Sequence, residues 1–161
     1  MLPQIRLATG LCLILCLSFL AMPRVAQAHC QIPCGIYDDD TRLKLMEEHV
    51  TTIEKSMQQI IEISAAADKN WNQLVRWVAN KDEHADALTQ IVTEYFLQQR
   101  IKPFDGGDAA ARETYVAELS QCHEILVHAM KAKQTTDLAH VEALRGLIHD
   151  FAHSYLGEDD K

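Results

Sequence analysis

The stretch DDDTRLKLMEEHVTTIEKSMQQI, residues 38–60, decides the fold. Its apolar residues recur three and four positions apart, which places them on one face of an α-helix. They are Leu43, Met46, Val50, Ile53, Met57 and Ile60. Three aspartates and Thr41 precede this stripe, and they supply capping side chains and negative charge at a helix start. The segment therefore predicts a long amphipathic helix that begins near Asp40.

Three further stripes of the same kind predict three more helices. The second ends near Pro103, because proline disfavours a helical residue before it. It consists of Trp71, Leu74, Val78, Ala85, Leu88, Val92 and Tyr95. The third follows a turn and cap at Gly106-Gly107-Asp108, and consists of Tyr115, Leu119, Cys122, Leu126 and Ala129. The fourth, which Gly157 can cap, consists of Val141, Leu144, Ile148, Phe151 and Tyr155.

The connections between these stripes are short, and short connections favour antiparallel neighbours. We therefore predict that residues 38–161 form one all-α domain, an antiparallel up-and-down four-helix bundle. We expect Trp71 and Trp77 to pack inside it, and Cys122 to be a small buried side chain.

The first 28 residues have the layout of a secretory signal peptide. Arg6 precedes an apolar run, residues 7–22, which is followed by the small-x-small sequence Ala26-Gln27-Ala28. Such a peptide would direct the chain to the periplasm or the cell exterior. Cleavage after Ala28 would then release a mature chain without stable membrane association. The alternative is an uncleaved membrane anchor, for which the apolar run is short.

The chain is acidic, with a formal net charge of −8, and the signal peptide would remove Arg6 and Arg24 but no acidic residue. An acidic surface disfavours nucleic acid and anionic lipid as partners. We therefore expect no nucleic-acid partner, and any attraction of a small anion must come from local positive groups.

Residues 29–37, HCQIPCGIY, lie outside the bundle pattern, because Pro33 and Gly35 prevent a regular helix. We call this segment the hook. Cleavage before His29 would leave that residue with a free α-amine. The amine, the amide nitrogen and sulfur of Cys30, and the sulfur of Cys34 can surround one metal ion in a plane. Such a set suits Ni(II) or Cu(II), and the imidazole of His29 remains as an axial donor.

The pattern His-Cys-x-x-Pro-Cys-Gly-x-Tyr, directly after a processing site, resembles the nickel superoxide dismutase family. The matching residues are His29, Cys30, Pro33, Cys34, Gly35 and Tyr37. The resemblance continues through the helical domain, including Tyr95-Phe96 near the end of the second helix.

The resemblance implies an enzyme that disproportionates superoxide to O₂ and H₂O₂ by cycling Ni(II) and Ni(III). It implies one nickel ion per subunit, held by His29, Cys30 and Cys34, and a homohexamer of four-helix bundles. Tyr37 and Tyr95 match the tyrosines that close over the open face of the metal. Some members place a glutamate–arginine pair behind the axial imidazole; here His84 takes the place of the arginine, and we assign no acid.

Three other interpretations stay open at this point. The hook could capture nickel or copper in an exported helical protein without turnover. Cys30 and Cys34 could instead form a small disulfide loop. Tyr37 and Tyr95 could be packing residues whose hydroxyls find hydrogen-bond partners.

Overall fold

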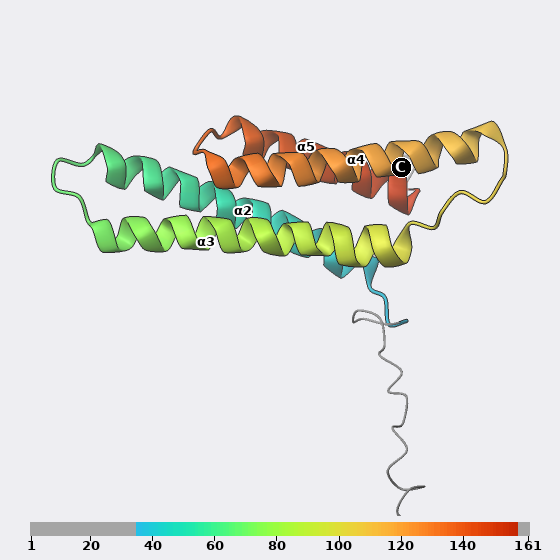
Figure 1. Cartoon of the computed structure of the whole chain (residues 1–161), viewed down its shortest axis with the longest axis horizontal. Helices are drawn as coiled ribbons and strands as arrows, with labels where there is room; N and C mark the ends of the chain where they lie inside the picture. Colours follow the sequence, from blue (N-terminus) through green and yellow to red (C-terminus); the bar gives the residue numbers. More distant parts are fainter. Residues whose placement is uncertain (1–34, 158–161) are drawn as a thin grey trace, which may run out of the picture. The chain divides into compact units, whose positions relative to one another are not determined.

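Four long helical segments make up the part of the chain that a computed structural model describes, residues 35–157 (Figure 1). Helix α2 spans Asp39–Ala65 and α3 spans Trp71–Gln90; α3 continues into a π-helical segment, η1, over Ile91–Arg100. Helix α4 spans Ala109–Gln134 and α5 spans Ala139–Leu156. Residues 35–157 contain no β-strand. The hook ligands and the predicted signal peptide lie outside the described residues.

Each helix runs back along the one before it (Figure 1). Helix α2 packs against α3 and α5, and α4 packs against the same two neighbours. The prediction of an all-α antiparallel bundle is therefore confirmed. In the described part of the chain, no helix is both long and apolar enough to cross a membrane.

Side chains cap the helices where the sequence predicts it. The Asp38 carboxylate accepts a hydrogen bond from the Thr41 amide at 3.0 Å, and the Asp108 carboxylate accepts one from the Ala111 amide at 2.8 Å. These contacts satisfy amides that have no partner inside the helix. Gly157 adopts a left-handed conformation, φ +65°, that favours glycine, and it ends α5.

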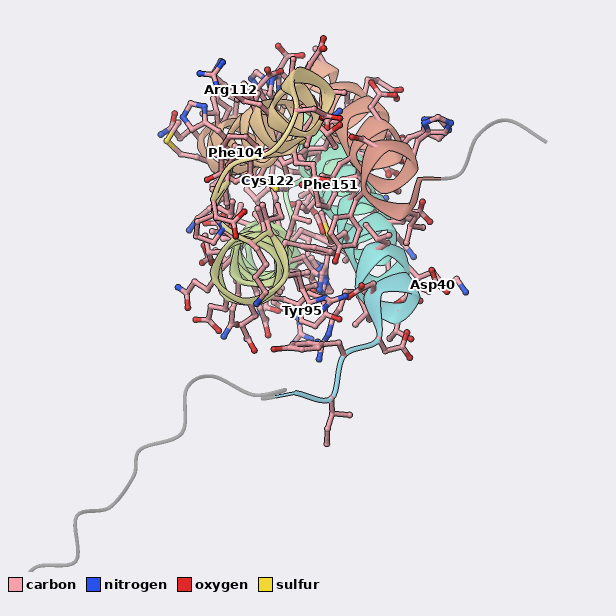
Figure 2. All side chains as sticks on the ribbon, turned by 90° about the vertical axis from the view of Figure 1, so that its right-hand side faces the viewer. Asp40, Tyr95, Phe104, Arg112, Cys122 and Phe151 are labelled. Atoms are coloured by element: carbon pink, nitrogen blue, oxygen red, sulfur yellow. The ribbon has the colours of Figure 1, made fainter. Side chains whose placement is uncertain are left out.

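The core follows the predicted stripes closely in α2 and α5. All six residues of the first stripe are buried, and Figure 2 places Phe151 between the helices. In α4 the deepest positions include Ile125 and Ala132, which the predicted stripe does not contain, while Tyr115, Leu119 and Leu126 are only partly buried.

The first two turns of α3 depart from the prediction. Trp71 and Val78 were expected in the core, but 64% and 40% of their surfaces are exposed. The reason is helix length: α2 has 27 residues, about 40 Å, whereas α5 has 18, about 27 Å. The hairpin of α2 and α3 therefore extends past the α4–α5 connection (Figure 1). Trp77, a little further along α3, is half-buried.

Candidate metal centre

The described chain begins at the end of the hook. Gly35 has φ +81°, a backbone conformation that L side chains rarely adopt, so glycine at this position permits the turn. Ile36 is exposed and Tyr37 is half-exposed, and Asp38 then caps α2. Cys34, the last predicted ligand, comes three residues before Tyr37 in the sequence. Tyr37 is thus the described aromatic residue nearest in sequence to the predicted ligands.

The structure brings Tyr37 together with Tyr95, as the sequence predicts. Their ring centroids lie 5.8 Å apart in an edge-to-face arrangement, which is a favourable geometry for two aromatic rings. Tyr95 belongs to η1 and is almost completely buried. Figure 2 shows it beside the start of α2.

A carboxylate that sequence reasoning missed lies at the centre of this region. Asp39, the first residue of α2, accepts a hydrogen bond from the Tyr95 hydroxyl on Oδ1 at 2.5 Å. Arg100 donates to both carboxylate oxygens, Nε to Oδ1 at 2.8 Å and Nη2 to Oδ2 at 2.5 Å. The Tyr155 hydroxyl of α5 donates to Oδ2 at 3.1 Å. We call Asp39, Tyr95, Arg100 and Tyr155 the carboxylate cluster.

Two guanidinium groups lie over the tyrosine rings. The central carbon of Arg100 is 4.5 Å from the centroid of Tyr37, and that of Arg42 is 5.1 Å from the centroid of Tyr95. A cation at such distances is attracted to the face of an aromatic ring. Arg100 therefore connects the carboxylate cluster to Tyr37.

The cluster shifts the ionisation of its members. Burial works to raise the pKa of Asp39, but the hydrogen bonds from Arg100, Tyr95 and Tyr155 outweigh it, and the pKa falls below its ordinary value. Burial, and then the hydrogen bond to Asp39, raises the pKa of Tyr155 to about 12. The same two causes raise the pKa of Tyr95. At neutral pH the carboxylate is thus ionised and both phenols are protonated.

His84, which the resemblance predicts to take the place of an arginine, lies beside another histidine. Its Nδ1 lies 2.9 Å from Nδ1 of His49 on α2. Burial and the nearby His84 lower the pKa of His49, which favours the neutral form of His49. Glu47, two residues before His49 on α2, is exposed.

Cys122 behaves as predicted. Its side chain is fully buried, and burial raises the pKa of the thiol to about 12, with a smaller effect from Glu118. A protonated, buried thiol is a poor metal ligand. Between Gly35 and Gly157, moreover, no three His, Cys, Asp or Glu side chains converge on a point that could hold a metal ion.

A family model described as nickel-containing superoxide dismutase matches residues 24–159. The chain belongs to this family. The match covers most of the sequence, including the hook, and it confirms the activity and the cofactor that the resemblance implies: the protein is a nickel-dependent oxidoreductase that disproportionates superoxide. The comparisons with curated proteins and with solved structures returned no match.

The nickel dismutase needs a donor set that residues 35–157 do not supply. The hook, whose predicted ligands lie outside the described residues, contains the thiolate, amine and amide nitrogen donors that the sequence predicts for nickel. Sequence reasoning missed Asp39, Arg100 and Tyr155, which meet in the carboxylate cluster, and Arg100 of this cluster lies over the Tyr37 ring. Asp39 had been interpreted only as helix-start charge, and Tyr155 only as a core residue.

Proposed function

We propose that the mature dismutase begins at His29 and holds its nickel through the hook. The ligands are the α-amine and imidazole of His29, the amide nitrogen and sulfur of Cys30, and the sulfur of Cys34. The family match over residues 24–159 carries this proposal, because it makes nickel the cofactor and includes the hook. The nickel ion supplies electron exchange with superoxide by alternating between Ni(II) and Ni(III).

Tyr37 and Tyr95 restrict access to this centre in our proposal. Tyr37 follows Cys34 by three residues, and Tyr95 supports its ring from the side at 5.8 Å. Two rings in this arrangement can exclude anions larger than superoxide. The Tyr95 hydroxyl is bonded to Asp39, so Tyr37 is the member of the pair that can present its hydroxyl to water beside the metal.

We further propose that residues 1–28 are a cleaved signal peptide, that residues 29–37 are the metal-binding hook, and that residues 38–161 are the bundle domain. The enzyme would then act in the periplasm or outside the cell. Exposed apolar side chains on one face of α3, Trp71, Val75 and Val78, offer a surface for contact between subunits, and the proposed number of six subunits follows from the family.

A matched pair of chains tests the hook. One begins at His29 and the other carries a single additional glycine before His29. Both are loaded with nickel, and superoxide decay is followed after rapid mixing. The additional residue turns the terminal amine into an amide, a weaker donor, so we expect the extended chain to lose its activity.

Far-UV circular dichroism of the two chains should be the same, because the bundle begins at Asp39. Full activity in the extended chain would contradict the proposed ligands. Nickel binding by the His29 chain without superoxide decay would indicate a metal carrier instead of an enzyme.

A further inference from the structure

Asp39 joins three parts of the bundle at one point. It lies at the start of α2, and its carboxylate accepts four hydrogen bonds, three from η1 and one from α5. A carboxylate offers about four acceptor sites, so these contacts fill it. The ion pair with Arg100 is bidentate and partly buried, with 18% and 27% of the two side chains exposed. These features distinguish it from an exposed surface pair that contributes little.

Both described groups that contact the Tyr37 ring are themselves bound to Asp39. Arg100 lies over the face of the ring, and Tyr95 meets it edge to face. The bidentate contact fixes the plane of the Arg100 guanidinium, and the hydroxyl contact fixes the rotation of Tyr95. The preceding residue of the hook, Ile36, is 82% exposed, so it does not hold Tyr37 against the bundle.

We propose that Asp39 is a positioning residue of the dismutase, which holds Tyr37 in place at the end of the hook through Arg100 and Tyr95. It touches neither the metal nor superoxide. The proposal rests on the proposed function, since it assumes that Tyr37 acts beside the hook nickel. Without Asp39, Arg100 loses its bidentate partner and Tyr95 its acceptor, and the half-exposed Tyr37 ring can turn away.

Asp40 provides a matched control for the charge of Asp39. It is the next residue of α2, it is exposed, and Figure 2 places it on the outer side of the helix. Asp39→Asn and Asp40→Asn change the net charge equally. They also alter the favourable charge at the start of α2 in the same way. They differ in that only Asp39 accepts hydrogen bonds from Tyr95, Arg100 and Tyr155.

The test uses the nickel-loaded chain beginning at His29. We expect Asp39→Asn to lower the second-order rate constant for superoxide decay about tenfold, because small displacements of positioning groups are costly. Nickel content should be unchanged. Asp40→Asn should stay within about twofold of the parent, since two neighbouring charges of the same sign have similar long-range effects on superoxide. Inhibition by azide, a larger anion, should strengthen in Asp39→Asn only.

Two more variants separate positioning from a general loss of stability. Phe104→Leu weakens packing at a residue outside the carboxylate cluster, where the ring stacks on Tyr115, so its rate constant should equal that of the parent. Arg100→Gln should lower the rate constant as Asp39→Asn does. The double variant Asp39→Asn/Arg100→Gln should be no slower than about the slower single variant, because both act through Tyr37.

The outcomes are distinguishable. A parent chain that binds nickel but does not consume superoxide overturns the proposed function itself. An active parent, together with equal rate constants and equal azide inhibition for Asp39→Asn and Asp40→Asn, overturns the role of Asp39 alone. Multiplicative losses in the double variant would also overturn it. Circular dichroism of each variant verifies that the bundle has formed.

Discussion

Phe96 connects the core to the aromatic residues near Tyr37. Replacing Phe96 with leucine should lower the free energy of unfolding more than the same replacement of Phe104. Its side chain is fully buried, and its ring meets three others edge to face: Tyr95 at 5.0 Å, Phe151 at 4.9 Å and Tyr155 at 5.3 Å. Each such pair contributes about 0.5–1.5 kcal/mol beyond the burial of its area. Leucine keeps an apolar side chain but loses all three contacts, so we expect a loss of roughly 1.5–4.5 kcal/mol.

Phe104 is the matched control. It is 37% exposed, and its ring stacks on one partner only, Tyr115, at 6.3 Å. Phe104→Leu should therefore cost about 0.5–1.5 kcal/mol. Urea unfolding of the nickel-free chain, followed by circular dichroism, measures both free energies of unfolding. Equal losses in the two variants would refute the reasoning that edge-to-face contacts of Phe96 stabilise this end of the bundle.

The remaining predictions concern the thiols and the phenols. Cys122→Ser should lower the free energy of unfolding by about 1–3 kcal/mol, because it buries a hydroxyl in an apolar site, and it should leave the nickel content unchanged. Cys34→Ser should lose nickel and keep its stability. Metal analysis and urea unfolding measure both properties, and nickel loss in Cys122→Ser would contradict the prediction. The raised pKa of Tyr155, about 12, stabilises the fold fully below the ordinary tyrosine pKa of about 10, and that contribution is lost as the pH rises toward 12. The urea midpoint of the nickel-free chain should thus fall between pH 10 and 12, and less steeply in Tyr155→Phe; identical slopes would speak against the raised pKa of Tyr155. The lowered pKa of Asp39 acts in the opposite range: its contribution is present above about pH 4 and is lost as the pH falls below that value, so the parent should lose more stability than Asp39→Asn on acidification.

Sequence periodicity was sufficient to predict the bundle because most of its helix faces are set locally. Leu43 to Ile60 in α2 and Val141 to Phe151 in α5 occupy core positions at the expected spacing. The error at Trp71 and Val78 has a non-local cause, since their exposure depends on α4 and α5 ending short of the α2–α3 hairpin. No pattern within α3 itself could have indicated it.

The contacts of the carboxylate cluster could not be predicted from the sequence. Two of the contacts that define the carboxylate cluster join Asp39 to residues 61 and 116 positions away, Arg100 and Tyr155. The position of Arg100 also depends on the π-helical segment of residues 91–100, and no proline or glycine in that segment indicates it in the sequence. Such turns occur often at functional sites. The proposed ligands, by contrast, are neighbours in sequence, so a metal site could be predicted from their order alone.

The starting residue and the metal content of the natural protein test the account most directly. Native mass spectrometry of the enzyme purified from its own cells measures both together and also counts the subunits. We predict a subunit that begins at His29 and carries one nickel ion. A subunit that begins elsewhere, or one whose Cys30 and Cys34 are joined to each other and hold no metal, would contradict the proposed centre.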